Sequence, residues 1–164
     1  MKNLSPQKII IICLSAFVIG VILTAGILFR AAPSHMILED KSPYGFEETI
    51  ARFEEEVEAA GWSIVGYQDM QEVLNNHGHE VLDIRIFELC SARYSAVILA
   101  QDDERIVSPL MPCRVSIYKK SNGNTYITRL NSLLMARPFG GLINEVMQKA
   151  GSETEDIIAA VLQE

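Results

Sequence analysis

Two cysteines, Cys90 and Cys113, occupy the positions that point most directly to chemistry. Cys90 ends an expected strand just before an expected helix, where the helix dipole favours a thiolate. Cys113 opens the first strand of an expected hairpin, and we expect the two residues to approach each other. Three roles stay open: buried packing groups, a structural disulfide, or a reactive pair for redox chemistry or ligand binding. No Cys-x-x-Cys spacing supports a thioredoxin-like exchange motif.

Two histidines form a second candidate site. His77 and His79 flank Gly78, and imidazoles in such a loop could ligate a metal ion or haem iron. Only cysteines and acidic residues elsewhere in the sequence could complete the site. The alternative interpretation is a solvent-facing helix C-terminus, where the dipole favours a protonated imidazole.

Two arginines form the third candidate. Arg114 and Arg129 lie on the two strands of the expected hairpin and could meet across it as an anion-binding patch. Alternatively, each arginine pairs with one of the many carboxylates. The sequence contains no nucleophile elbow, phosphate-binding glycine loop, dinucleotide fingerprint or zincin helix, which favours a non-enzymatic protein.

The hairpin itself is predicted from about residue 113 to 130. Val115 and Ile117 alternate with polar residues on its first strand, and Ile127 does so on its second. Asn122-Gly123 between the strands tolerates the positive φ angles of a tight turn.

Amphipathic helices and short strands surround this hairpin. Helical spacing predicts a helix over 46–60, and Asp69 is expected to cap a second one. Strands are predicted over 62–67 and 81–89, a helix over 92–100, and a short helix over 132–136 capped by Asn131. Two final helices, 142–150 and 153–162, are predicted to be separated at Gly151-Ser152. The sequence therefore predicts an α+β domain with a small antiparallel or mixed sheet and helices packed on it.

The N-terminus predicts a membrane anchor. Residues 9–29 are 21 residues without a charge, and such a helix is about 31 Å long, enough to span a bilayer. A cleavable signal peptide is the competing interpretation, but the apolar run is long and Arg30 follows it. Lys2 and Lys8 precede the span, so the positive-inside preference places residues 1–8 in the cytoplasm and the domain outside. We expect a single-pass protein of a bacterial inner or plasma membrane, with a tether over 30–43 and a globular domain over 44–164.

The domain is acidic. Residues 44–164 contain ten lysines and arginines and nineteen aspartates and glutamates, a net charge of −9. This charge argues against a nucleic-acid partner.

The order of elements and the two cysteine segments resemble a known family. Phe87-Glu88-Leu89-Cys90 and Leu110-Met111-Pro112-Cys113 with the following Arg114-Val115-Ser116-Ile117-Tyr118 are similar to those of the bacterial domain of unknown function 302. Two asparagines and one proline that usually flank these cysteines in the family are absent here. The resemblance covers roughly residues 46–162 and implies a compact α+β fold, a homodimer, and small-molecule or haem-like binding.

Together these features predict a membrane-anchored extracytoplasmic module that binds an unknown small ligand near Cys90 and Cys113. The alternative from another class is a thiol redox or sulfur-handling protein that uses the same two cysteines. A second alternative is haem or metal binding through His77 or His79.

Overall fold

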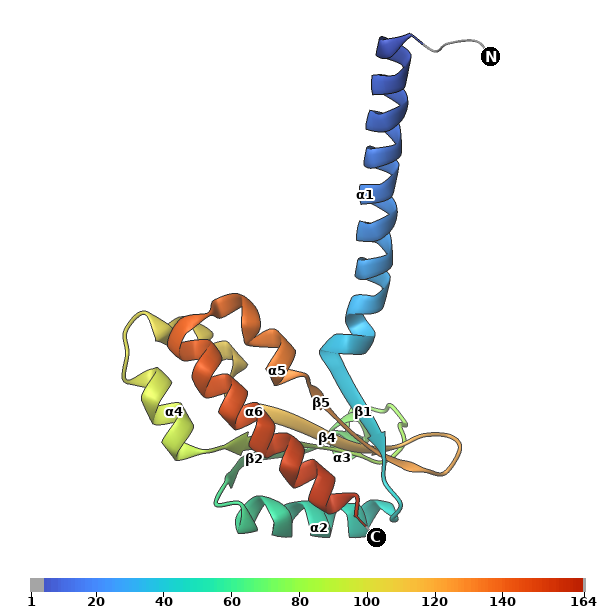
Figure 1. The fold of residues 1–164 in the computed structure, drawn as a ribbon. Coiled ribbons are helices and arrows are strands. Elements are labelled where there is room, and N and C mark those ends of the chain that lie inside the picture. The colour runs from blue at the N-terminus through green and yellow to red at the C-terminus, as the bar shows by residue number, and fades with distance from the viewer. Residues whose placement is uncertain (1–4, 164) are drawn as a thin grey trace. The chain divides into compact units, whose positions relative to one another are not determined.

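The structure is a computed structural model that describes residues 5–163. The chain divides after His35 into an N-terminal unit and a domain that begins at Met36. The N-terminal unit contains all but the last residue of the helix α1 (Pro6–Met36), whose most apolar stretch has a mean hydropathy of 2.8 (Figure 1). By length and composition α1 could cross a membrane, as a membrane anchor or as a signal sequence. The predicted span 9–29 lies within this helix, and of the predicted N-terminal segment 1–8, residues 1–4 lie outside the described part of the chain.

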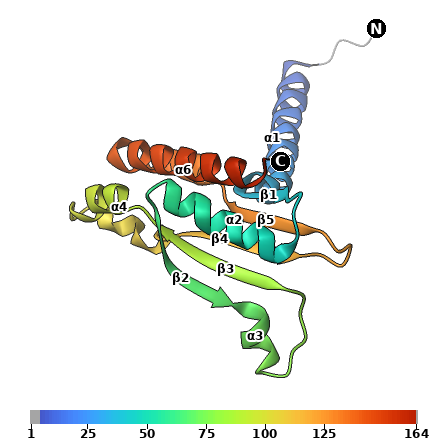
Figure 2. The same ribbon diagram turned by 90° about the horizontal axis from the view of Figure 1, so that it is seen from below.

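The domain is a five-stranded antiparallel sheet with helices packed on it, as the α+β prediction required (Figures 1 and 2). The strand order is β1-β5-β4-β3-β2. The strands are β1 (Ile37–Lys41), β2 (Ser63–Asp69), β3 (Ile84–Cys90), β4 (Cys113–Lys119) and β5 (Thr125–Leu130). The α-helices are α2 (Phe46–Ala59), α3 (Met70–Asn75), α4 (Ala92–Leu99), α5 (Ser132–Met135) and α6 (Gly141–Val161), and the 3₁₀ helices are η1 (Glu104–Leu110) and η2 (Arg137–Phe139).

One face of the sheet carries the core. Phe53 and Val57 of α2 and Ile157, Ile158 and Val161 of α6 are buried against alternate residues of the central strands, namely Phe87, Leu89, Val115, Ile117 and Ile127. Alternate side chains of a strand point to opposite faces, so this list defines the covered face. Figure 2 shows α2 lying over the strands and α6 next to it, whereas α3 lies at the far end of β2 and β3.

The predicted tether is wrong in its conformation. Helix α1 continues past Arg30 and Pro33 to Met36, and residues 37–41 form the edge strand β1. Strand β1 pairs antiparallel with β5, with Ile37 opposite Leu130 and Lys41 opposite Tyr126. The five residues of β1 show no clear alternation, so the local sequence does not predict a strand. They form a strand because they pair with β5, some ninety residues away in sequence, through backbone hydrogen bonds.

The hairpin is confirmed, but its loop is longer than a two-residue turn. The last paired residues are Lys119 and Thr125, and the Lys120 amide donates to the Asn124 carbonyl. Gly123 has a φ of 81°, while no residue other than glycine has a positive φ among the described residues. Asn122 therefore acts through its side chain, which accepts from the Asn124 amide at 3.0 Å.

The predicted break between two C-terminal helices is also wrong, because α6 runs unbroken through Gly151. A Cβ at Gly151 would lie 3.0 Å from a Leu133 methyl carbon and 3.3 Å from the Ser132 Cβ. The glycine thus allows α6 to pass close to α5 and does not end a helix. The expected caps Asp69 and Asn131 are confirmed, since each side chain accepts from the amide three residues on.

Candidate functional site

An apolar cavity lies at one end of the covered sheet face. Its water-accessible volume is about 50 Å³, more than the ~10–15 Å³ that a single water needs. The lining comes from α4, from α6 and the first residue of α5, from the end of η1 and the two residues after it, from β3 and β4, and from the residues just before β2 and α4. The residues are Trp62, Leu89, Ser91, Tyr94, Ser95, Ile98, Leu110, Met111, Pro112, Cys113, Ser132, Val146, Met147, Ala150 and Gly151.

Helical periodicity explains how α4 and α6 form the walls. Tyr94, Ser95 and Ile98 recur at the spacing of one face of α4, and Met147 and Ala150 share one face of α6. The two helices pack against each other beyond the strand ends. The cavity is the space that their side chains leave above Leu89 and Cys113.

Cys113 reaches the cavity because of its strand register. It lies opposite Leu89 on β3, so its side chain points to the covered face of the sheet. Burial raises the pKa of the Cys113 thiol, and the charge that Cys90 can carry raises it further. The buried thiol is therefore protonated at neutral pH.

Cys90 lies on the neighbouring strand, one position beyond Leu89, and its sulfur is 3.4 Å from the Ser95 hydroxyl oxygen. Ser95 lines the cavity, whereas Cys90 itself does not. Both thiols are free. The fold thus brings the two predicted cysteines to the same end of adjacent strands without joining them.

Glu153 holds the aromatic wall of the cavity. It accepts hydrogen bonds from the Trp62 indole at 3.0 Å and from the Tyr94 hydroxyl at 2.6 Å, and it pairs with Arg93. Burial raises the pKa of Glu153, but these three donors lower it more, and the net shift is downward. An ionised Glu153 on α6 therefore orients two side chains that face the cavity.

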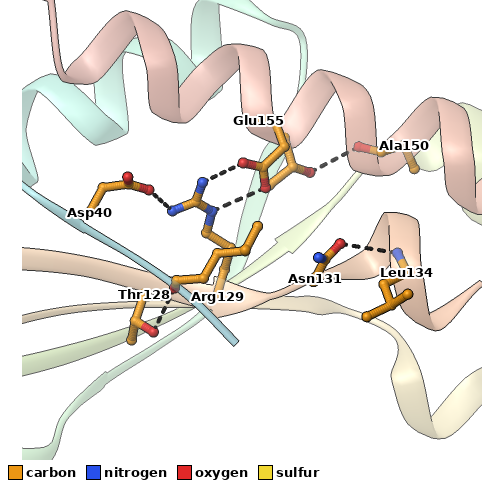
Figure 3. Close-up of polar contacts among 9 residues, drawn as sticks. Asp40, Thr128, Arg129, Asn131, Leu134, Ala150 and Glu155 are labelled. Carbon is orange, nitrogen blue, oxygen red and sulfur yellow. Dashed lines mark hydrogen bonds and ion pairs between the residues drawn. The ribbon is translucent and has the colours of Figure 1, made fainter. Parts of the chain in front are cut away.

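Arg129 forms a second polar centre beside the cavity (Figure 3). Its side chain is only 7% exposed and lies between Asp40 of β1 and Glu155 of α6. The guanidinium pairs with both Glu155 oxygens, one of them at 3.0 Å from Nε, and also with Asp40. Burial lowers the pKa of Arg129, yet the two carboxylates outweigh that effect and raise it.

The predicted meeting of Arg114 and Arg129 does not occur across the hairpin. Arg129 lies opposite Val115, so Arg114 points to the other face of the sheet, where it pairs with Glu88 at 2.6 Å. The alternative, in which each arginine pairs with carboxylates, is the one that the structure shows. Both residues nevertheless line the same pocket of about 270 Å³, which Cys113 also lines.

The two histidines lie far from these features in sequence and are exposed in the turn after α3. The Nδ1 atom of His77 lies 2.8 Å from the Val73 carbonyl, one turn earlier in that helix. Within residues 5–163, no group of three His, Cys, Asp or Glu residues is placed to hold a metal ion. Their predicted alternative, a solvent-facing helix end, agrees with this placement.

A family model described as domain of unknown function DUF302 matches residues 38–164. The chain belongs to the DUF302 family. The match begins within β1, so the family domain includes the strand that the sequence prediction assigned to a tether.

The fold of this DUF302 domain is similar to that of a solved structure, an uncharacterized conserved DUF302 protein from Bacillus stearothermophilus. The TM-score is 0.70 at 19% sequence identity, and the alignment covers 78% of this chain and 99% of that one. At this identity the similarity concerns the fold alone. A comparison with curated proteins finds no match.

Several residues around the DUF302 cavity were not predicted from the sequence. Glu153 and Glu155 lie in the first turn of the predicted helix 153–162. Met111 belongs to a family-like segment and Met147 to the predicted helix 142–150, but neither was assigned a role. The partners of Glu153 and Glu155 lie 26 to 91 residues away in the chain, so no local pattern links them. Two signals were available in the sequence: Trp62 at a strand start and Arg129 in a strand interior. When such residues are buried, their N–H groups need acceptors such as carboxylates.

The Arg129 network predicts an asymmetric response to arginine removal. Arg129→Met should destabilise the domain by about 2 kcal/mol, because Asp40 and Glu155, whose side chains are partly exposed, both lose a cation that is almost wholly out of water. Arg114→Met, the same change on the exposed side of the neighbouring strand, should cost no more than about 1 kcal/mol. Chemical denaturation of the full chain in detergent, followed by the fluorescence of its single tryptophan, measures both. Equal losses of stability in Arg129→Met and Arg114→Met would contradict a special structural role for the buried Arg129.

The raised pKa of Cys113 predicts slow alkylation near neutral pH. Thiolate is the reactive form of the cysteine. In a Cys13→Ser, Cys90→Ser background, the pH at which the alkylation rate rises should therefore be higher for the folded chain than for the urea-unfolded chain. By linkage, the protonated thiol stabilises the fold up to the ordinary thiol pKa, and this contribution is lost as the pH rises further. Coincident alkylation profiles for folded and unfolded protein would show that burial does not control this thiol.

Proposed function

We propose that this chain is a membrane-anchored extracytoplasmic module that binds a small ligand in the cavity at Cys113 and is not an enzyme. The observation that carries the proposal is the cavity itself, a concave, largely apolar space with a few polar groups. Such a lining is typical of small-ligand sites, but the volume of about 50 Å³ is well below the ~300–1,000 Å³ of drug-sized pockets and admits only a very small ligand or ion. Of the two cysteines that the family-like segments supply, Cys113 lines the cavity, and Cys90 contacts Ser95, which lines it.

The polar groups near the cavity are satisfied by one another. Glu153 is shared by Trp62, Tyr94 and Arg93, and Arg129 is shared by Asp40 and Glu155. Groups already bound to one another are poorly placed to exchange protons with a ligand. This arrangement supports binding and not acid–base catalysis.

The anchor is supported by the length and hydropathy of α1 and by the charges at its ends. Two positive residues, Lys2 and Lys8, precede the span and one, Arg30, follows it, and this difference favours a cytoplasmic N-terminus. The domain would then lie outside the cytoplasm of a bacterial cell.

We propose a homodimer that uses the open face of the sheet. Ile84, Ile86, Tyr118 and Tyr126 alternate away from the covered face, and helices α2 and α6 pack on the opposite side. The half-buried apolar residues of this face offer a surface that a second copy could cover.

A thiol redox protein is the second candidate, favoured by two free cysteines at the ends of adjacent strands. In that case Cys90 and Cys113 would cycle between two thiols and a disulfide. The first candidate requires no such change.

Native mass spectrometry of the full chain, purified from its own membrane in mild detergent, tests the binding proposal. We expect a retained mass on the wild type and its loss in Ala150→Leu, which fills the cavity. Ala159→Leu makes the same change on an exposed position of α6 and should keep the mass. No retained mass, or equal retention in both variants, would reject ligand binding here. The same spectra show whether the particle is a dimer and whether two hydrogens have been lost to a disulfide.

Reporter fusions test the orientation. Alkaline phosphatase, which is active outside the cytoplasm, should be active when joined after Glu164, and a fluorescent protein that folds only in the cytoplasm should be dark there. The expected loss of phosphatase activity on deleting residues 9–29 provides the control. The reverse pattern would place the domain in the cytoplasm.

A further inference from the structure

Three sulfur-containing residues from separate parts of the chain line the same cavity. Met111 follows η1, Cys113 begins β4, and Met147 lies in the middle of α6. All three are partly buried, and Cys90 contacts Ser95, which lines the cavity. The fold thus gathers one thiol and two thioethers around a space of about 50 Å³.

The rest of the lining restricts what this sulfur group could bind. The other polar lining residues are Ser91, Ser95, Ser132, Tyr94 and Trp62, and the described lining includes no carboxylate or imidazole. Hard cations such as Mg²⁺ and Ca²⁺ require several oxygen ligands, and structural zinc sites require four thiolate or imidazole ligands. Thiolate and thioether ligands instead select soft ions such as Cu(I).

We propose that the cavity binds one Cu(I) ion through the Cys113 thiolate and the thioethers of Met111 and Met147. This inference rests on the proposed function, since it names the class of ligand that the cavity takes. Leu89, Ile98 and Val146 supply apolar walls around the remaining space. A low-coordinate soft ion tolerates apolar surroundings far better than a hydrated divalent ion.

The binding step has a simple balance. Cys113 is a protonated thiol in the free protein, so a Cu–S bond forms as the S–H bond breaks and one proton leaves to solvent. The two methionine thioethers each donate a lone pair, and none of their own bonds breaks. Copper stays Cu(I) and sulfur is neither oxidised nor reduced. Affinity should therefore rise about tenfold per pH unit while the free thiol remains protonated.

Packing is the competing explanation for the two methionines, because flexible thioethers also fill irregular gaps in a core. The two explanations differ in what a conservative change does. Met147→Leu preserves volume and apolarity but removes a ligand, so packing predicts no effect on copper and ligation predicts weaker binding.

Anaerobic titration of the full chain with Cu(I) in detergent, against a chromophoric Cu(I) chelator, tests the proposal. The background is Cys13→Ser, which removes the thiol of the N-terminal helix. We expect one Cu(I) per chain, release of one proton, and quenching of Trp62, which lines the cavity. Cys113→Ser and Met147→Leu should each weaken binding at least about tenfold. Met70→Leu on α3 is the matched control and should leave the affinity unchanged.

Three results would overturn the inference: no binding that competes with the chelator, binding that Cys113→Ser and Met147→Leu leave unchanged, or binding that Met70→Leu weakens equally. The Trp62 fluorescence of the copper-free variants shows whether each one is folded. If the native protein retains a mass that Ala150→Leu removes, yet no Cu(I) binds, the metal assignment fails and the binding module stands. If neither ligand nor copper is held, both fail.

Discussion

The structure depends on β4 being paired along both edges. Strand β4 pairs with β3 from Cys113 to Tyr118 and with β5 from Val115 to Lys119, so it is the middle of the sheet. Its alternate residues Val115 and Ile117 are fully buried under α2 and α6. Its first residue, Cys113, is held in register with Leu89. The position of this cysteine is therefore set by a ladder of backbone hydrogen bonds and not by a mobile loop.

Helix α6 connects the core to the polar groups around the cavity. Its C-terminal half contributes Ile157, Ile158 and Val161 to the core, and its middle supplies Glu153 and Glu155. Glu153 reaches the aromatic wall of the cavity, whereas Glu155 reaches Arg129 and thereby the edge strand β1. One rigid helix therefore orients both polar centres, and Gly151 lets it lie close enough to α5 to do so.

The buried cation at Arg129 has a structural consequence for the start of the domain. Strand β1 is short and lies at the edge of the sheet, where one side of its ladder is unpaired. The Asp40 carboxylate adds a charge-assisted contact to that ladder, with the Arg129 side chain almost wholly out of water. Residues 36–41 are thus part of the folded domain, and the match of the family model from residue 38 agrees with this.

The sequence by itself determined the type of most elements. Helical spacing identified α2, Asp69 and Asn131 marked the starts of α3 and α5, and the alternating residues around Asn122-Gly123 identified β4 and β5. These features are encoded within a few residues of each other, so a local pattern is enough to read them. The apolar N-terminal helix was likewise predicted from a local pattern, its uninterrupted run of apolar residues.

Only the tertiary structure decided which distant residues meet. Strand β1 exists because β5 offers it a ladder, Gly151 lies within a helix because α5 passes close by, and Arg114 and Arg129 separate because register places them on opposite faces. The sulfur residues and the carboxylates of α6 converge in the same way, across separations of tens of residues. Such contacts follow from register and packing, which no short segment of the chain contains.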